Sequence, residues 1–464
     1  MTGEEKDDSI GLEVKGMFTY IKLKNFMSFK DVTFDLKKGN KEPKNFIAVY
    51  GENGSGKSNF VSSINLLRRS IDSFEEFVNK QKITELAQEK DLIKGLVETI
   101  FGSNNILNLL NSCRMAECNK ETKIEYGFQI GRYEGYYIIS FTEKFVYEKL
   151  YYFTGKQRGA LFEIKSDDGK ISSVFSGKLF KNKKAESEIK EEIEKYWGKH
   201  TFLSILNKER HEKNEQYIKD NYLLYVFDIL DMLQEITVHY KKTSYSGSEV
   251  RAGKPANILH RLDAGKIQAQ YISVLDCSER ILRDFFTQAY ADIKDVYYDR
   301  IYEEEISYKL YVKKMIGGKI RTIGFQNESA GTQHILEIIH ALLGAFCGVT
   351  VVYDEIDDGI HDLLLKNILE SMIDDITGQL IITTHNTYML ESIDIKSAYV
   401  ITVDYQGNKE VRCLDRYPRI QGTNNPRNMY LKGLFGGVPI VDSFDYDMIL
   451  SELRNDSIDV EGGE

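Results

Sequence analysis

The sequence lacks the features by which membrane and secreted proteins are usually identified. Its longest apolar runs, such as VTVVY at 349–353, are far shorter than the ~20 residues that a membrane helix needs. The amino terminus MTGEEKDDS is acidic and polar, the opposite of a secretory signal. The five cysteines are odd in number and scattered, which argues against a disulfide framework. We therefore expect a cytoplasmic protein.

The chain also lacks an excess of positive charge. Its formal net charge is -10, which argues against nucleic-acid binding driven by the overall charge of the protein. A local basic groove, or DNA held by a partner, remains compatible with this charge. There is no internal repeat, and no heptad run is long enough for an extended coiled coil. With 464 residues, of which 42% are hydrophobic, the chain is globular and large enough for two or three domains.

The hydrophobic periodicity predicts an α/β core with additional strands and helices. Residues 17–36 alternate apolar and polar positions as two strands would, and NFIAVYG at 45–51 fits a strand buried on both faces. The pattern of residues 122–165 indicates further strands. The pattern of residues 183–240 indicates helices that are rich in Lys and Glu. Near the carboxyl end, VTVVYDE and QLIITTH each follow a helical pattern, which indicates parallel strands.

A glycine-rich loop follows the first buried strand. Gly51-x4-Gly56-Lys57-Ser58 matches the GxxxxGK[ST] pattern between a strand and a helix, where backbone N–H groups and the helix dipole bind phosphates. We expect Lys57 to reach the β- and γ-phosphates and Ser58 to bind Mg²⁺. A plain glycine-rich turn is the alternative. The residues expected to contact the nucleotide are Gly51, Asn53, Gly54, Ser55, Gly56, Lys57, Ser58 and Asn59.

Two later strands end in polar residues that suit such a site. We expect Asp354, after VTVVY, to bind the metal through its water shell and Glu355 to polarise an attacking water. Alternatively, the two acids cap the next helix, although Asp358 can do that without them. We expect His385, after LIITT, to donate a hydrogen bond to the γ-phosphate. A lone histidine in that position is more often structural.

A second candidate phosphate-binding helix start lies upstream of the acid pair. Residues 328–332 read ESAGT directly before a helical pattern, and Ser329 is a natural N-cap. The small residues leave the helix amides exposed. The glycine-rich loop at 51–58 already supplies such amides within one chain. Ser329 and Gly331 are therefore expected to bind the phosphates of a nucleotide held by another copy. The alternative is an ordinary capped helix.

These four stretches together resemble the head domain of the ABC-type ATPases. They match its P loop (GENGSGKS), signature (ESAGT), Walker B motif (VVYDEID) and H-loop (TTH). The early IKLKNFMSFKDVTFDL resembles the SMC, RecF and OLD-like branch. ESAGTQ and YLKGLFGGVPIV resemble segments of OLD-like ATPases from anti-phage systems such as the PARIS, Septu and AbiL types. Ala330, His361 and Asp362 depart from the family pattern, and Gln129 is a guess for the Q-loop glutamine.

The resemblance implies an α/β P-loop NTPase fold, an ABC-ATPase head with an N-terminal β-subdomain. Residues 17–150 and 262–445 are expected to form the composite ATPase domain, and 151–261 an inserted, mainly helical domain. Residues 1–16 are expected to be a disordered leader and 446–464 an acidic tail. This tail has no apolar core pattern, so we expect no built-in nuclease domain.

The functional implication is a slow ATP hydrolase with ATP and Mg²⁺ as cofactors. Two copies, or a higher homo-oligomer, would enclose ATP between Lys57 and Ser58 of one and Ser329 and Gly331 of the other. We expect an anti-phage sensor that controls a separate effector, such as a Toprim or other nuclease, after a phage-derived trigger. The alternative is a RecF- or SMC-like DNA-repair ATPase. Its candidate DNA contacts are Lys178, Lys181, Lys183 and Lys184, although interleaved glutamates favour a solvated surface.

Overall fold

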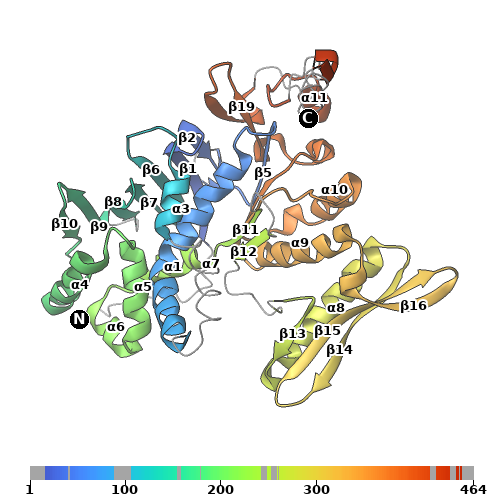
Figure 1. The fold of residues 1–464 in the computed structure, drawn as a ribbon, viewed down its shortest axis with the longest axis horizontal. Coiled ribbons are helices and arrows are strands. Elements are labelled where there is room, and N and C mark those ends of the chain that lie inside the picture. Colours follow the sequence, from blue (N-terminus) through green and yellow to red (C-terminus); the bar gives the residue numbers. More distant parts are fainter. Residues whose placement is uncertain are drawn as a thin grey trace, which may run out of the picture.

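Three sheets of four or more strands organise the part of the chain that the structure describes, and helices cover them (Figure 1). The structure is a computed structural model. It describes residues 16–39, 42–87, 106–153, 158–177, 179–241, 248–251, 259, 261–417, 425–438, 446–448 and 450–451. Most of the expected leader and tail, and Lys178, lie outside the described residues. None of the described helices is long and apolar enough to cross a membrane.

The first sheet is antiparallel and has seven strands in the order β10-β9-β8-β7-β6-β1-β2. Its strands are β1 Gly16–Phe26, β2 Phe29–Asp35, β6 Thr122–Ile130, β7 Tyr133–Phe141, β8 Phe145–Phe153, β9 Arg158–Asp167 and β10 Lys170–Phe175. Alternate residues, such as Ile21 and Leu23 of β1, are buried beneath the helices, as the period of two predicts. The expected N-terminal strands are thereby confirmed.

The second sheet contains the parallel core, in the order β12-β11-β17-β18-β5-β19-β20. Its strands are β5 Phe46–Gly51, β11 Thr237–Lys241, β12 Ser248–Arg251, β17 Thr350–Tyr353, β18 Gln379–Thr383, β19 Ala398–Val403 and β20 Lys409–Cys413. The five strands from β11 to β19 run parallel. All of β5 is buried, with Ile47 and Val49 in one hydrophobic core and Ala48 and Tyr50 in the other. This confirms the predicted doubly covered α/β sheet.

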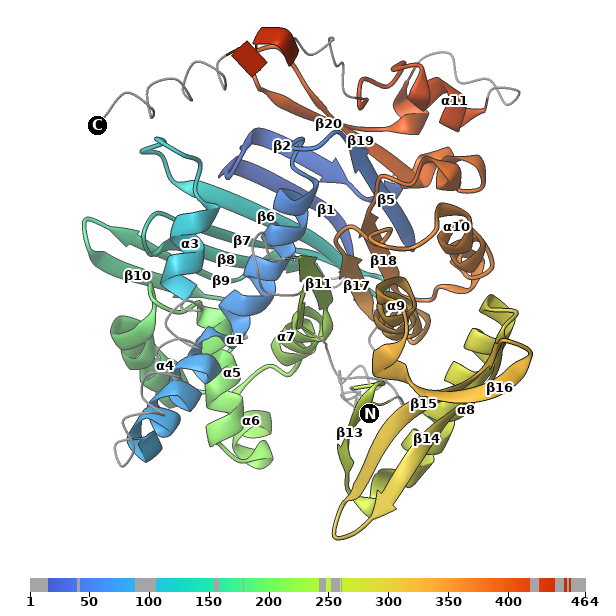
Figure 2. The ribbon, with the colours of Figure 1, turned by 45° about the vertical axis from the view of Figure 1, so that its right-hand side comes forward.

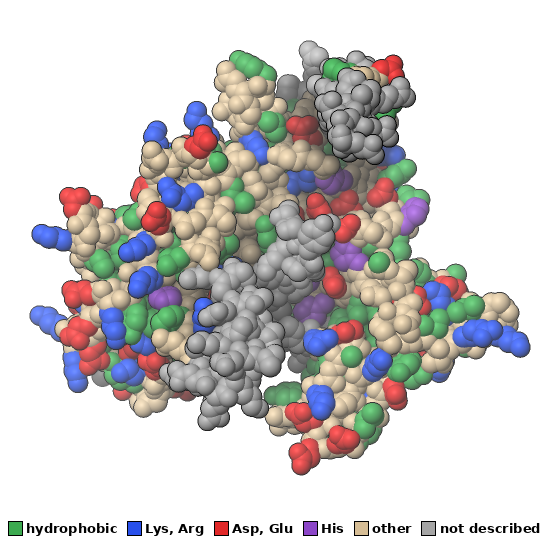
Figure 3. All heavy atoms as spheres, in the orientation of Figure 1, with side chains coloured by type: hydrophobic (Ala, Val, Ile, Leu, Met, Phe, Trp, Pro, Cys, Tyr) green, Lys and Arg blue, Asp and Glu red, His purple; other side chains and the backbone are tan. Residues whose placement is uncertain are grey.

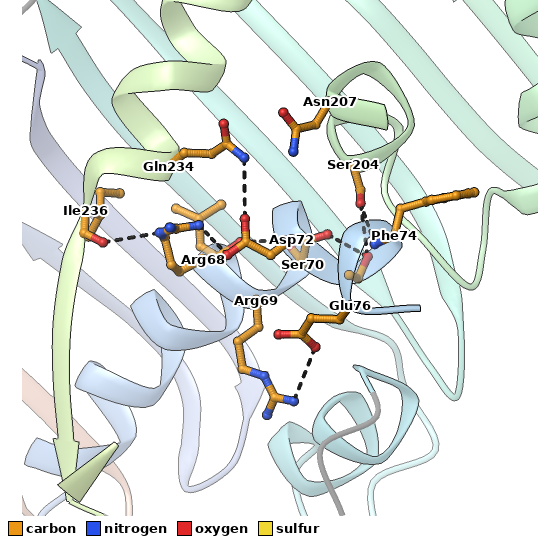
Figure 4. Close-up of polar contacts among 12 residues, drawn as sticks. Arg68, Arg69, Ser70, Asp72, Phe74, Glu76, Ser204, Asn207, Gln234 and Ile236 are labelled. Atoms are coloured by element: carbon orange, nitrogen blue, oxygen red, sulfur yellow. Dashed lines mark hydrogen bonds and ion pairs between the residues drawn. The ribbon is translucent and has the colours of Figure 1, made fainter. Parts of the chain in front are cut away.

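Helix α1 (Lys57–Ala87) begins at the P loop and packs against both seven-stranded sheets (Figure 2). Polar contacts also join it to the segment that follows the first sheet (Figure 4). Arg68 Nε donates to Ile236 O at 3.3 Å, and Gln234 Nε2 donates to Asp72 Oδ1 at 3.4 Å. These contacts attach the middle of α1 to this segment, and α1 in turn continues directly from the P loop.

The segment 151–261, expected as a mainly helical insertion, contributes to both sheets. Its helices are α4 Lys183–Tyr196, α5 Phe202–Glu212, α6 Glu215–Asn221 and α7 Tyr225–Glu235. Strands β9 and β10 extend the first sheet, and β11 and β12 form one edge of the second. Residues 237–240, read as helical from the sequence, are strand instead because Thr237–His239 pair in parallel with Val351–Tyr353.

The third sheet has four strands and projects from the rest of the molecule (Figure 1). It consists of β13 Ala264–Ile267, β14 Ile293–Tyr302, β15 Ile306–Ile316 and β16 Lys319–Gly324, and α8 (Ile272–Ala289) packs on it. It leads into α9 (Ala330–Phe346), which lies against the second sheet. The remaining α-helices and strands of the described residues are β3 Lys37–Lys38, β4 Glu42–Pro43, α3 Ile106–Cys113, α10 Asp362–Glu370 and α11 Pro426–Leu431.

Candidate nucleotide-binding site

The candidate site lies where the parallel strands of the second sheet end. The P loop follows β5, Asp354 follows β17 and Thr384 follows β18. These strands are adjacent and parallel, so their carboxyl ends meet at one edge of the sheet. In open α/β sheets this edge is where ligands bind. The three motifs that lie far apart in the sequence therefore converge.

The P loop has the backbone shape of a phosphate cradle. Gly54 has φ +80, and a Cβ added there would meet no atom within 4 Å, so the side of the loop that its side chain would occupy is open. Gly56 has φ +111, and a Cβ there would lie 2.7 Å from Cζ of Phe29. Both positions therefore favour glycine. Ser55 is buried and its Oγ has no hydrogen-bond partner among the described residues, whereas Asn53 is exposed.

Lys57 is buried at the start of α1. Its Nζ donates to the carbonyl oxygens of Gly51 at 2.9 Å and Glu52 at 3.2 Å. Burial lowers the pKa of Lys57, and the nearby carboxylates of Glu355 and Asp354 partly offset that effect. The ammonium group thus lies over the loop that would hold the phosphates, next to the acid pair.

Ser58 and Asp354 meet beneath the P loop. Ser58 Oγ donates to Asp354 Oδ1 at 3.3 Å, and Thr383 Oγ1 donates to the same oxygen at 2.7 Å. Asp354 is only 5% exposed, and burial raises its pKa despite these hydrogen bonds. Its other oxygen, Oδ2, is buried without a hydrogen-bond partner in the described part of the chain. A hydroxyl beside a carboxylate with a spare oxygen fits the ligand chemistry of Mg²⁺.

Glu355 adopts a conformation that is unusual for its residue type. Its φ of 50 lies in the left-handed region, which costs energy for a residue with a Cβ. Its backbone N–H donates to Thr383 Oγ1 at 2.7 Å, so Thr383 binds both members of the acid pair. Such strain is typical of functional positions.

His385 is held at the same edge by its backbone. Its N–H donates to Asp357 Oδ2 at 3.0 Å, and its side chain is exposed. Partial desolvation and the charge of Lys57 lower the pKa of His385, while Asp357 and Glu355 act in the opposite direction. The ring is therefore biased towards the neutral form, which has one N–H to donate.

The two predicted signature residues lie elsewhere. Ser329 is the N-cap of α9, and its Oγ accepts a hydrogen bond from Thr332 N at 3.2 Å. A Cβ on Gly331 would lie 2.4 Å from the carbonyl oxygen of Gly359, in the loop after Walker B. Within the described residues, no hydrogen bond or ion pair joins Ser329 or Gly331 to the P loop of the same chain.

Lys409, which belongs to none of the sequence motifs, also contacts the P loop. Its Nζ donates to Gly54 O at 2.6 Å and to Ser28 Oγ at 2.7 Å. Asn59 Nδ2 donates to the same hydroxyl at 2.6 Å. Burial lowers the pKa of Lys409. Strand β20 thus places a second lysine at the loop, and only the fold shows it.

Gln129, the guess for the Q-loop, lies away from this edge. It pairs with Met17 in the first sheet, and its Nε2 donates to Gly131 O at 2.7 Å. The adjacent Gly16 accepts a hydrogen bond from Thr350, the first residue of β17, whereas Asp354 follows the last. Gln129 is therefore near the amino end of the parallel strands and not at the candidate site.

Comparison with protein families decides the class. Residues 46–391 match the family described as "AAA domain, putative AbiEii toxin, Type IV TA system". The chain belongs to this family. With its P loop at the end of β5, this AAA-family chain has the fold of a P-loop NTPase. A search of curated proteins gives no match.

Solved structures that resemble this AAA-family chain include three SMC heads. A head bound to the C-winged helix domain of ScpA is 14% identical, covers 85% of this chain and 96% of its own, and has a TM-score of 0.42. The head domain from Thermotoga maritima is 14% identical over 85% and 98%, with a TM-score of 0.35. A Pyrococcus furiosus head with an extended coiled coil, bound to the C-terminal domain of ScpA, is 14% identical over 86% and 96%, with a TM-score of 0.36.

Proposed function

We propose that this chain is an ATP hydrolase that binds ATP and Mg²⁺ at the carboxyl ends of β5, β17 and β18. The observation that carries the proposal is the contact of Ser58 with Asp354, whose second oxygen is buried without a hydrogen-bond partner among the described residues. A buried carboxylate of this kind is costly without a cation. Ser58 and Asp354 would hold Mg²⁺, which neutralises phosphate charge when bound.

Lys57 would bind the phosphates from within the loop. Its Nζ donates to two neutral loop carbonyl oxygens, and an anionic phosphate oxygen would be a stronger acceptor for the same ammonium group. The backbone amides of residues 51–59 would surround the phosphate oxygens. Lys409 would keep the loop in this shape through its bonds to Gly54 and Ser28.

Glu355 and His385 would act on the terminal phosphate. Glu355 would orient a water molecule for attack on the γ-phosphorus and accept its proton as ADP leaves. His385, biased towards its neutral form, would donate a hydrogen bond to a γ-phosphate oxygen. Thr383 positions the backbone of Glu355 and the carboxylate of Asp354 through one hydroxyl.

A homodimer would complete the site. Among the residues that the structure describes, no hydrogen bond joins Ser329 or Gly331 to the P loop of their own chain, and their helix start presents backbone amides. We propose that they bind the γ-phosphate of a nucleotide held by a second copy. Two ATP molecules would then lie between two protomers.

The biological role that we propose is a cytoplasmic sensor of bacterial anti-phage defence that controls a separate effector. The family description, which names a putative toxin and a TA system, supports this role. A DNA-repair role has less support. Lys181, Lys183 and Lys184 are exposed, but Lys184 pairs with Glu188 at 3.8 Å, and α4 carries several more glutamates. This surface does not form a continuous basic patch.

The first experiment measures ATP binding by titration calorimetry with Mg²⁺. Lys57→Ala should weaken binding by roughly 10- to 100-fold, because charge-assisted hydrogen bonds are worth about 1.5–3 kcal/mol. Lys30→Ala, which removes an exposed lysine from β2, is the matched control and should bind as the wild type does. Unchanged ATP affinity in Lys57→Ala would refute the site.

The second experiment tests the assembly and the role. Glu355→Gln should retain ATP and accumulate as a dimer in light scattering, because the nucleotide is bound but not hydrolysed. A strictly monomeric protein with non-hydrolysable ATP, Mg²⁺ and its cognate partner would refute the dimer. Co-purification with the product of a neighbouring gene supports the defence role, whereas salt-dependent binding of duplex DNA by the isolated protein would replace it with the repair role.

A further inference from the structure

A cavity of about 390 Å³ lies between β11, α9 and the residues that border the third sheet. Its buried floor consists of His239, Leu262, Phe325 and Leu336. On the face drawn in Figure 3, histidine and acidic side chains gather along the hollow beside the third sheet. The volume is within the range of sites for small molecules, and an apolar floor with a few polar groups is their usual composition.

The imidazole of His239 is the polar group on this floor. The side chain is only 3% exposed, and neither ring nitrogen has a hydrogen-bond partner among the described residues. Its ring stacks on Tyr353 at a centroid distance of 4.4 Å, which fixes its orientation. Burial and the neighbouring His340 and His334 lower the pKa of His239 to about 3, so it is neutral at physiological pH. A neutral imidazole offers one donor and one acceptor.

The rim of the cavity carries a small negative excess. Arg261 pairs with Asp263 at 3.3 Å, which leaves Glu337 as the carboxylate without an arginine among the charged lining residues. Gln326 and Gln333 add carboxamides. This charge disfavours a phosphorylated ligand.

We infer that this cavity binds a nucleoside, with its base on the floor against Phe325 and His239 and its sugar towards Glu337. A base supplies adjacent hydrogen-bond donors and acceptors for a neutral imidazole and a flat apolar face for the floor. Bound bases are held in this way, by hydrogen bonds to their edge and by aromatic or apolar contact. A carboxylate that accepts from sugar hydroxyls is likewise common in nucleoside recognition.

The cavity is connected to the nucleotide-binding site through β11. The backbone oxygen of His239 accepts a hydrogen bond from Asp354 N at 2.9 Å. The ring of His239 stacks on Tyr353, whose hydroxyl contacts His334 Nε2 at 2.8 Å. A bound nucleoside therefore contacts the strand next to Asp354, and it should alter ATP hydrolysis. This coupling rests on the proposed function, whereas the binding site does not.

The test titrates adenosine, guanosine, cytidine and uridine into the full chain, with the nucleotide-binding site filled by ADP and Mg²⁺. At least one nucleoside should bind saturably in calorimetry or ligand-observed NMR, and it should also bind Lys57→Ala without ADP. His239→Phe keeps a ring on Tyr353 but removes both nitrogens, and should weaken binding at least tenfold. Glu337→Ala, at an exposed position, should weaken it severalfold. Glu370→Ala, an exposed glutamate of α10, is the matched control and should not change it.

Three outcomes would overturn the inference. The first is that none of the nucleosides binds at millimolar concentration. The second is that His239→Phe and Glu337→Ala, both still folded and binding ADP, bind the nucleoside as well as Glu370→Ala does. The third is that only a polyamine such as spermidine binds, which would show that the cavity selects a cation. A nucleoside that binds without changing ATP hydrolysis would refute the coupling alone. Unchanged ATP affinity in Lys57→Ala would refute the proposed ATPase but not the nucleoside site.

Discussion

The hydroxyl of Thr383 joins both acids of the candidate site, so its removal is a sensitive test of the geometry. Thr383 is fully buried, and Oγ1 donates to Asp354 and accepts from the backbone of Glu355, both at 2.7 Å. Thr383→Val keeps the shape of the side chain but removes both bonds. Valine at this strand position is otherwise well tolerated.

The expected loss of stability follows from these two bonds. A hydrogen bond to a carboxylate contributes about 1.5–3 kcal/mol, and a buried N–H left without a partner costs about 1–3 kcal/mol. The two terms are not additive because they share one hydroxyl. Part of the loss is offset if Glu355 relaxes from its φ of 50, a strain of roughly 1–3 kcal/mol. We expect the free energy of unfolding to fall by about 1–3 kcal/mol.

The effect on catalysis should be larger than the effect on binding. In the proposed site ATP would be held mainly by Lys57 and the loop amides, so its dissociation constant should change little. Glu355 would lose the bond that fixes its backbone, and a displacement of about 1 Å in a catalytic group costs up to roughly 100-fold in rate. We expect kcat to fall between 10- and 100-fold, measured by phosphate release at saturating ATP.

Two variants separate this effect from a general loss of stability. Thr383→Ser keeps the hydroxyl and should retain most of the activity. Thr384→Val removes the neighbouring buried hydroxyl, which accepts from Asn386 N at 2.9 Å but contacts neither acid. It should destabilise the protein with a much smaller loss of kcat. If Thr383→Val hydrolyses ATP at the wild-type rate, or no more slowly than Thr384→Val, the positioning role is refuted.

Three further predictions test other parts of the site. Lys409→Met should weaken ATP binding about fivefold in calorimetry, since it removes the bonds to Gly54 and Ser28, while Lys409→Arg should restore part of it. Asp354→Asn should abolish the Mg²⁺-dependent rise in Tm that ATP causes. Folding raises the pKa of Asp354 above 3.8, so the protonated carboxyl favours the folded state. Its contribution to the free energy of unfolding is therefore present at low pH and is lost as pH rises. The nucleotide-free Asn variant should therefore be the more stable protein at pH 7 but not at pH 3. In α9, Gly331→Ala should lower ATPase activity at least tenfold, because its Cβ would clash with backbone at 2.4 Å. Gly344→Ala, 3.3 Å from a side-chain methyl, should be neutral or gain up to about 1 kcal/mol in a urea melt.

The sequence was informative where one short stretch determines both a strand and its end. The run FIAVYG is apolar on both faces, and so are TVVY apart from its first residue and QLIIT apart from its first and last residues. These patterns predicted parallel buried strands whose polar ends converge, and the structure has them. The motif GxxxxGKS then required a loop and a helix after β5, and α1 begins at Lys57.

Residues whose role depends on distant neighbours were not predicted from the sequence. Lys409 reaches Gly54 across 355 positions of the chain, and its surroundings in β20 resemble any exposed strand. His239 lies in a short strand that follows directly on a helix, so the helical pattern of its neighbours concealed it. Gln129 was chosen by residue type alone, and the pairing of β6 with β1 places it near the wrong end of the parallel strands.

The start of α9 packs closely against the loop after Walker B. Gly331 approaches Gly359 so closely that no side chain fits between them, and His334 Nδ1 contacts the carbonyl oxygen of Asp358. That loop begins directly after Glu355. If Ser329 and Gly331 bind a nucleotide held by a second copy, a shift of the start of α9 would also move this loop. The position of Glu355 in the same chain would then change without any movement of the P loop. Each protomer would then adjust its own catalytic glutamate according to the nucleotide of its partner, which is a physical basis for hydrolysis that depends on assembly.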